Sequence, residues 1–268
     1  MERVSWGLSE HQLAIGDRVI AEESAKREHL VVYLSGAHAY GFPSPDSDLD
    51  LKCIHVAPTG ALVGFEPPPF TYDRAEVIEG VEIDYTSNEL GQVLGGILTG
   101  NGNYLERVLG ATFMTPPGEL LASLSPLVRA VVSRRVHRHY RGFAANQQRE
   151  LAKTPTVKKL LYVLRTAMTG THLLTTGELE TDLRVLAPRY GLADLGVDAL
   201  IAAKRAGERA AADPAMLTEW EPRLAGILSA VDRARDTSPL PEEPPPDAVR
   251  ALETWLVATR RARFAPTA

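Results

Sequence analysis

Two aspartates, Asp48 and Asp50, open an apolar segment in the N-terminal part of this 268-residue chain. Because side chains alternate along a strand, both carboxylates project from one face, and Leu49, Leu51 and Cys53 project from the other. Neighbouring carboxylates repel each other and favour a cation between them. Hard oxygen ligands suit Mg²⁺, which completes its coordination with water and substrate phosphate. The spacing therefore predicts a magnesium site on one face of a strand.

A glycine, Gly36, ends the apolar segment that precedes the aspartates in the chain. A residue without Cβ at the end of a strand lets backbone N–H groups approach phosphate oxygens closely. A glycine followed by Asp-x-Asp therefore predicts a metal ion that holds a nucleoside triphosphate.

At these residues the chain resembles the nucleotidyltransferase superfamily typified by DNA polymerase beta. The string Ser35-Gly36-Ala37-His38-Ala39-Tyr40-Gly41, followed by Pro45-Asp46-Ser47-Asp48-Leu49-Asp50, is more narrowly similar to predicted nucleotidyltransferases that accompany RNA ligases. One departure is Ala37, which stands where such proteins usually carry serine. A hydroxyl contact to the terminal phosphates must then come from Ser35, from Ser47 or from the backbone, or be absent.

Six residues of this string are expected at the nucleotide: Ser35, Gly36, Ala37, His38, Tyr40 and Ser47. For His38, contact with phosphate or with the aspartate pair is favoured over direct proton transfer, and a structural hydrogen bond is the simpler alternative. Tyr40 either stacks on the base or fills the core.

The polymerase-beta-like fold implies a third carboxylate on a strand beside the Asp-x-Asp strand. The segment 77–85 is the nearby candidate, and it carries Glu82 and Asp84 on one face. The pattern Thr86-x-x-Glu89 predicts a capping box and a helix start, which favours the acid nearer to it. The run from Gly100 to Glu106 resembles a Gly-Asn-Pro-x-x-Leu-Glu segment of the RNA-ligase-associated relatives, and counting back from it also selects Asp84. Glu82 is the alternative.

The composition is that of an ordinary globular protein, with 44% hydrophobic and 24% charged residues and a net charge of -5. Neither the N-terminal residues nor any later run is apolar enough to predict secretion or a membrane span, so we expect a cytoplasmic protein. The one cysteine, Cys53, excludes an intramolecular disulfide and a thiolate metal site.

Hydrophobic periodicity predicts strands and helices in the N-terminal part and long helices after it. With the resemblance, it implies an α/β (α+β) fold, in which a nucleotidyltransferase domain with a small mixed sheet precedes an all-helical domain. Strands are expected at 30–35, at 48–56 and at 77–85, the last with a turn near Gly80, and an irregular loop is expected at 59–72. Helices are expected at 9–28, 127–151, 156–175, 179–186, 197–212, 216–235 and 248–264. The predicted boundaries are 1–117 for the first domain, 118–236 for the helical domain, 237–247 for a proline-rich linker and 248–268 for a C-terminal helix.

The first two helices of the helical domain are strongly basic. They carry only one acid, Glu150, and ten cationic residues, which are Arg129, Arg134, Arg135, Arg138, Arg141, Arg149, Lys153, Lys158, Lys159 and Arg165. Lys158, Tyr162 and Arg165 share a helix face, and the relatives carry a similar Lys-x-x-x-aromatic-x-x-Arg pattern, so Lys158 and Arg165 are assigned to the triphosphate.

Four further arginines, Arg134, Arg135, Arg138 and Arg141, form a basic stripe that suits an RNA backbone, and three of them, Arg134, Arg138 and Arg141, share one helix face. The alternative for this stripe is a solvated face of two surface helices.

The function that these residues predict is metal-dependent transfer of an NMP group from an NTP, with ATP as first choice. Two Mg²⁺ ions, for which Mn²⁺ can substitute, would be held by Asp48, Asp50 and Asp84. RNA ends, tRNA, a protein hydroxyl and a small molecule all fit as the acceptor. The alternatives are a nucleotide- or RNA-binding module without catalysis, which Ala37 favours, and an antitoxin-like partner of a ribonuclease.

Overall fold

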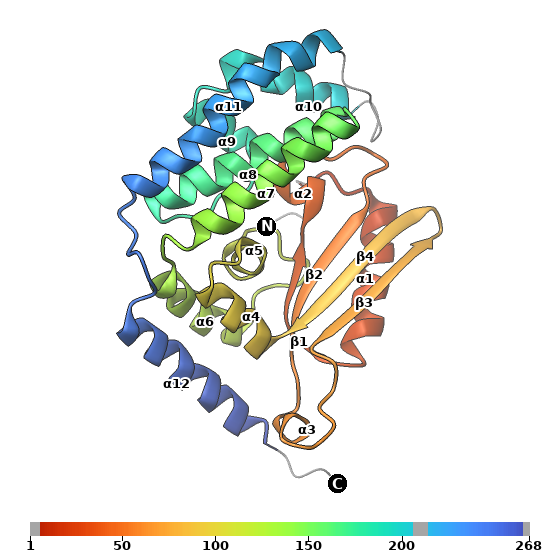
Figure 1. Cartoon of the computed structure of the whole chain (residues 1–268). Coiled ribbons are helices and arrows are strands. Elements are labelled where there is room, and N and C mark those ends of the chain that lie inside the picture. The colour runs from red at the N-terminus through yellow and green to blue at the C-terminus, as the bar shows by residue number, and fades with distance from the viewer. Residues whose placement is uncertain (1–5, 206–213, 265–268) are drawn as a thin grey trace. The chain divides into compact units, whose positions relative to one another are not determined.

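A computed structural model describes residues 6–205 and 214–264 of the chain. Its contacts divide the chain into two compact units, which we name by their content. The sheet unit comprises Ser9–Ser35, Asp48–Val132 and Pro244–Ala268, and the helical unit comprises Met1–Leu8, Gly36–Ser47 and Ser133–Glu243. The chain therefore passes from one unit to the other several times (Figure 1).

The sheet unit is built on a four-stranded mixed sheet with the order β1-β2-β4-β3. Its strands are β1 (Glu28–Leu34), β2 (Leu49–Val56), β3 (Thr71–Ile78) and β4 (Val81–Glu89). β2 pairs with β1 in the antiparallel sense and with β4 in the parallel sense, and β3 and β4 form an antiparallel hairpin. The two central strands, β2 and β4, therefore run in the same direction side by side.

Helices cover both faces of this sheet. One face carries Leu49, Leu51 and Cys53, which are completely buried, and α1 packs on it with Gly16 beside Leu49. Burial raises the pKa of the Cys53 thiol to about 12, so Cys53 is a small core residue, as its position predicts. The helices of this unit are α1 (Glu10–Ser24), α3 (Thr59–Leu62), α4 (Leu90–Leu98), α5 (Gly102–Leu109), α6 (Glu119–Val131) and α12 (Pro246–Ala262).

The helical unit has a pair of long helices at its centre, α7 (Val136–Lys153) and α8 (Val157–Thr176). Gly170 of α8 lets the helices approach closely, because a Cβ at this position would lie 2.4 Å from Cβ of Tyr140 on α7. The other elements are α2 (Gly36–Tyr40), α9 (Leu183–Arg189), a 3₁₀ turn at Ala193–Leu195, α10 (Val197–Arg205) and α11 (Pro214–Asp236). The end of the helix expected at 197–212 lies outside the described residues.

The expected fold class is confirmed, since a small mixed sheet is combined with many helices. The expected domain boundaries, with a division at residue 117, stay predictions. The contacts place α6 and α12 with the sheet. In the described part of the chain, no helix is both long enough and apolar enough to cross a bilayer.

The turn expected near Gly80 is confirmed, because β3 and β4 meet at a tight turn in which Glu79 and Gly80 have φ of 50° and 84°. Two positive φ values in a two-residue loop match the twist of the strands that it joins. Part of the expected loop 59–72 is the start of β3.

The single helix expected at 127–151 is also wrong, since α6 ends at Val131 and α7 begins at Val136. Val132 is extended, and the backbone N–H of Arg134 donates to the carbonyl of Pro241. Adjacent β-branched residues weaken helix propensity here, and a carbonyl distant in sequence accepts the hydrogen bond of a residue between the helices.

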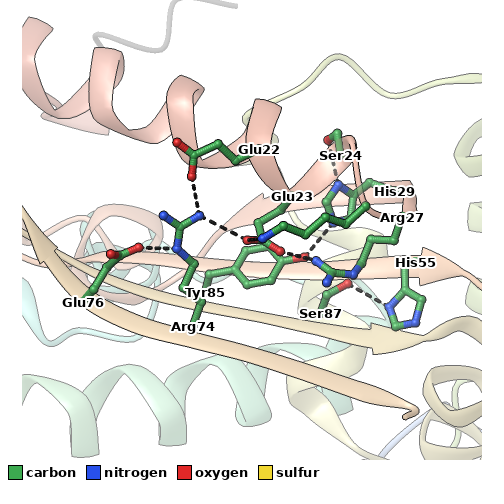
Figure 2. A network of polar contacts seen from close by, with 11 residues as sticks. Glu22, Glu23, Ser24, Arg27, His29, His55, Arg74, Glu76, Tyr85 and Ser87 are labelled. Atoms are coloured by element: carbon green, nitrogen blue, oxygen red, sulfur yellow. Dashed lines mark hydrogen bonds and ion pairs between the residues drawn. The ribbon is translucent and has the colours of Figure 1, made fainter. Parts of the chain in front are cut away.

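A polar network joins the C-terminal end of α1 to β3 and β4 (Figure 2). Its centre is Glu23, whose side chain is 4% exposed and accepts hydrogen bonds from Lys26, Arg27 and Arg74. Arg27 also donates to the hydroxyl of Tyr85 at 2.8 Å. The network fixes the rotation of Tyr85, and therefore of β4, against α1.

We predict that Glu23→Gln destabilises the protein most at neutral pH. Burial raises the pKa of the Glu23 carboxyl, but hydrogen bonds from Lys26, Arg27 and Arg74 outweigh burial and lower the pKa to about 2. A lowered pKa stabilises the fold above the unfolded-state value of 4.5, and this stabilisation is lost as pH falls from 4.5 towards 2. We expect a loss on the order of 2 kcal/mol at pH 7 in urea unfolding.

The difference between parent and variant should shrink as the pH is lowered below the ordinary carboxyl range. Glu22→Gln is the matched control, because Glu22 contacts the same Arg74 but is half exposed. Its expected cost is below about 0.5 kcal/mol. An equal cost for both variants, or a cost of Glu23→Gln that does not change with pH, would contradict this account.

Candidate functional site

The parallel register of β2 and β4 places Asp50 directly beside Asp84. The next pair in the same ladder, Leu49 and Ile83, is buried on the opposite face of the sheet. Paired residues of neighbouring strands share a face, so the two carboxylates project together from the more open side. Asp48 immediately precedes β2.

The register of β2 and β4 favours Asp84 over Glu82, because it pairs Asp84 with Asp50. The capping box that the sequence suggested at Thr86 does not support this choice. Thr86 lies within β4 and makes no capping box, because the strand continues to Glu89. Glu89 itself is the N-cap of α4, and its carboxylate accepts from the N–H of Gly91 at 2.7 Å. Glu82 is exposed and lies before the first pair of the β2–β4 ladder, Leu49 with Ile83, so it has no paired residue within β2.

The ammonium of Lys52 lies between the two paired carboxylates. Its Nζ is 2.7 Å from Oδ2 of Asp84 and 3.9 Å from Oδ1 of Asp50. It also donates to the hydroxyl of Thr86 at 3.4 Å. Sequence reasoning missed this residue, although its position two residues after Asp50 puts it on the same face of the strand. A side-chain cation therefore offsets the repulsion between the aspartates.

The chemistry of the donors fits a hard divalent cation. Asp48, Asp50 and Asp84 offer carboxylate oxygens, which are the ligands that Mg²⁺ prefers, and the strand register brings two of them to one face. Within the described residues, no three acidic, histidine or cysteine side chains are gathered closely enough to hold a metal ion as they lie. The three aspartates are residue types that fit Mg²⁺. The ammonium of Lys52 supplies positive charge next to Asp84.

The predicted motif glycine has a backbone conformation that explains its identity. Gly36 has φ of 66°, in the left-handed region that a residue with Cβ rarely adopts. The N–H of Ser35, just before it, donates to the carbonyl of Asp50 at 2.8 Å. This hydrogen bond joins the end of β1, just before Gly36, to β2, which carries Asp50.

The other predicted nucleotide residues of this string belong to the helical unit and are buried there: Ala37, His38, Tyr40 and Ser47. Nδ1 of His38 lies 3.0 Å from the carbonyl of Trp6, to which it donates. This contact is the structural hydrogen bond that the sequence allowed as the simpler role.

A buried lysine holds the loop before the aspartates. Nζ of Lys204 donates to the hydroxyls of Ser44 and Ser47, each at 2.7 Å, and the Lys204 side chain is completely buried. Sequence reasoning missed it, but α10 carries a signal: Val197, Leu200, Ile201 and Lys204 occupy one helix face. A lysine on an apolar stripe indicates a buried polar partner.

The expected face of Lys158, Tyr162 and Arg165 lies against α2 in the helical unit. The guanidinium carbon of Arg165 is 3.4 Å from the centre of the Tyr40 ring, and Tyr162 meets Tyr40 edge-on at 5.7 Å. Nζ of Lys158 lies 5.9 Å from the Tyr162 ring. Arg165 is 2% exposed, so the structure supports packing on Tyr40 as its role, and its contact with phosphate stays a prediction.

Three arginines of the expected RNA stripe are held by the chain itself. Arg134 donates to the carbonyls of Ser238 and Leu240, Arg135 pairs with Glu243, and Arg141 pairs with Asp232 at 3.0 Å. Their acidic and carbonyl partners lie about a hundred positions later in the chain, which local charge counting does not reveal. Arg138 is exposed.

Comparison with known families assigns the chain. The family model described as "RNA repair pathway DNA polymerase beta family" matches residues 16–258. The chain belongs to this family. Its resemblance to the polymerase-beta-like nucleotidyltransferases is thereby confirmed.

Among solved structures, this member of the RNA repair pathway DNA polymerase beta family is similar to a nucleotidyltransferase-like protein from Exiguobacterium sibiricum. The identity is 12%, the TM-score is 0.34, and the match covers 95% of this chain and 81% of that one. No curated protein matches the chain.

We predict that Lys52 and Asp84 are energetically coupled in the metal-free protein. A double-mutant cycle with Lys52→Ala and Asp84→Asn should give a coupling of about 0.5 kcal/mol, because Asp84 is half exposed and water weakens the pair. The coupling should fall as salt is added, since the charges are only partly buried. The measurement is urea unfolding of the parent, both single variants and the double variant.

The matched control is the same cycle with Glu82→Gln, which changes an exposed acid on the same face of β4 that has no paired residue within β2. Its coupling with Lys52 should be close to zero. Additive effects of Lys52→Ala and Asp84→Asn would show that the ammonium does not neutralise the pair.

Proposed function

We propose that this protein is a metal-dependent nucleotidyltransferase that moves an NMP group from an NTP, with ATP as the first candidate, to an acceptor hydroxyl. The observation that carries the proposal is the parallel register that pairs Asp50 with Asp84 on one face of the sheet. Membership of the RNA repair pathway DNA polymerase beta family supports it.

The three aspartates Asp48, Asp50 and Asp84 would hold Mg²⁺, with Mn²⁺ as a substitute. When bound, the ions supply charge neutralisation for the triphosphate and for the departing pyrophosphate. The acceptor oxygen forms a bond to the α-phosphorus while the bond from that phosphorus to the bridging oxygen breaks. Asp84, which is half exposed, would accept the proton of the acceptor hydroxyl.

Lys52 gives this arrangement a second source of positive charge. Its ammonium contacts Asp84 and lies near Asp50, so in the proposal it limits carboxylate repulsion before the metal ions bind. It would then be available to a phosphate oxygen.

The nucleotide itself is assigned to Ser35, Gly36, Ala37, His38, Tyr40, Ser47, Lys158 and Arg165. Within this set, Lys158 is more accessible than Arg165, which is buried against Tyr40. We therefore assign direct phosphate contact to Lys158, and to Arg165 the positioning of the Tyr40 ring.

A second candidate is a nucleotide-binding module without catalysis. Two observations favour it: alanine stands at position 37, and a lysine already balances the charge of Asp84. Activity of the parent protein separates the two candidates.

We predict that Asp50→Asn and Asp84→Asn each lower NMP transfer by at least about 100-fold, equivalent to about 2.7 kcal/mol in the barrier. Glu82→Gln, which removes a charge from the same strand face, should stay within about threefold of the parent. The assay incubates the purified protein with each α-labelled NTP, Mg²⁺ and total RNA or total protein, and measures the label transferred. Full activity in Asp50→Asn would reject the metal site, and absence of transfer with every NTP and acceptor would favour the binding module.

RNA is the acceptor that we propose, on the basis of the family description. Of the predicted stripe, we choose exposed Arg138 for the test, because Arg134 and Arg141 hold the fold and their removal would confuse stability with binding.

We predict that Arg138→Glu weakens RNA binding and reduces the dependence of log K on log salt by about one. Arg205→Glu, at an exposed arginine of α10, is the matched control and should change neither quantity. Fluorescence anisotropy with a labelled RNA at several salt concentrations measures both. Unchanged RNA affinity and slope in Arg138→Glu would remove the stripe from the proposal and leave protein or small-molecule acceptors.

A further inference from the structure

The sheet unit contains a hollow that none of the three aspartates lines. It encloses about 560 Å³ between the turn after α1, the C-terminal end of β2, Tyr72 of β3 and Arg263 after α12. His55 on β2 and Tyr72 project from the face of the sheet opposite Asp50 and Asp84. The volume suits a small organic ligand and exceeds what a single ion needs.

Cations predominate among the charged side chains of this pocket. Lys26, Arg27 and Arg263 line it, together with one carboxylate, Glu28. Arg263 pairs with Glu28 at 2.5 Å, and Lys26, whose side chain is 57% exposed, pairs with Glu23 at 2.8 Å. A guanidinium carries five N–H groups, so an arginine in an ion pair keeps donors for a ligand. A lysine ammonium has three N–H groups, so Lys26 also keeps donors for a ligand. The pocket therefore favours an anion.

The inner wall offers a planar and polar contact. His55 is 2% exposed, and its Nδ1 lies 2.9 Å from the hydroxyl of Ser87 (Figure 2). Its Nε2 is buried without a hydrogen-bond partner among the described residues. The Tyr72 ring meets the imidazole edge-on at 5.3 Å, and the guanidinium of Arg27 lies 4.2 Å from the centre of the Tyr72 ring.

A buried polar atom without a partner is costly, so an occupant that hydrogen-bonds Nε2 gains free energy. Burial lowers the pKa of His55 to about 4, and the imidazole is therefore neutral at pH 7. A neutral ring nitrogen suits the edge of a heterocyclic base, whereas the cations at the mouth suit a phosphate.

We propose that this pocket binds a nucleoside monophosphate, either free or as the terminal nucleotide of a nucleic-acid strand. Lys26 and Arg263 hold the phosphate, and Nε2 of His55 exchanges a hydrogen bond with the base. The site uses none of the residues assigned to NTP transfer, so it stands or falls independently of the proposed function.

The test uses the full-length Asp50→Asn/Asp84→Asn protein in EDTA, so that the candidate metal site does not contribute. Calorimetric titration with AMP, GMP, CMP and UMP should give saturable binding with Kd of about 1 mM or tighter for at least one of them. Lys26→Ala and Arg263→Ala should each weaken it about tenfold. Arg261→Ala is the matched control, since Arg261 is an exposed arginine on the same stretch of chain.

A spectroscopic readout reports on the base contact directly. In protein labelled with ¹⁵N-histidine, the Nε2 resonance of His55 should move on addition of the bound monophosphate. Inorganic phosphate should bind at least about tenfold more weakly and leave this resonance in place. Circular dichroism of each variant verifies that the fold is retained, and Lys26→Ala at an exposed side chain remains informative if Arg263→Ala does not fold.

Two further arms separate the sources of the ligand. A short RNA with a 5′- or 3′-terminal phosphate, compared with the same RNA without it, distinguishes a strand end from a free monophosphate. Preference for either source supports the proposal. The proposal is overturned if no monophosphate or phosphorylated RNA binds with Kd below about 1 mM, if Lys26→Ala binds as well as the parent, or if inorganic phosphate binds equally.

Discussion

The pairing of Asp50 with Asp84 across two parallel strands is the constraint on which the candidate site depends. Two carboxylates held side by side repel each other, and the fold tolerates them because the ammonium of Lys52 lies 2.7 Å from one and 3.9 Å from the other. In our proposal, the negative charge of this pair binds a divalent cation. The pairing depends on strand register, since a slip of one residue would turn Asp84 to the buried face.

Contacts on the opposite face of the sheet keep that register. Ile83 and Tyr85, the neighbours of Asp84 in β4, are almost completely buried, and the hydroxyl of Tyr85 accepts a hydrogen bond from Arg27. Arg27 is in turn held by Glu23 of α1 (Figure 2). The turn at Glu79 and Gly80 fixes how β4 returns along β3. The buried network of Glu23, Arg27 and Tyr85 thus helps to position the Asp84 carboxylate without contacting it.

Local patterns predicted the parts of the structure that depend on neighbouring residues. Strand alternation correctly separated Asp50 from Leu51 and Cys53, and helical spacing correctly grouped Lys158, Tyr162 and Arg165. The turn near Gly80 was predicted, whereas the start of β3 at Thr71 was missed because the prolines of the segment 59–72 indicated a loop. The choice of Asp84 rested partly on a capping box at Thr86, but the helix begins at Leu90 after the N-cap Glu89, and the observation that favours Asp84 is its pairing with Asp50.

Partners that are distant in sequence account for most of the remaining differences. Lys204 meets Ser44 and Ser47 across roughly 160 positions, and Arg134 meets Ser238 across about 100, so neither contact leaves a local signature. Counting charges along α7 suggested a free basic surface because the acids that neutralise it come from α11 and the segment after it. The burial of Arg165 and His38 was missed in the same way, since a residue's type does not say what covers it.

The central claim is that the paired aspartates form a divalent-cation site that Lys52 balances in the absence of metal. Its most direct test is Mn²⁺ titration of the purified protein followed by electron paramagnetic resonance, in which bound Mn²⁺ loses the signal of the free ion. We predict saturable binding in the parent, strengthened by ATP, lost in Asp50→Asn and in Asp84→Asn, and retained in Glu82→Gln. Equal Mn²⁺ binding by the parent and Asp50→Asn would contradict the account.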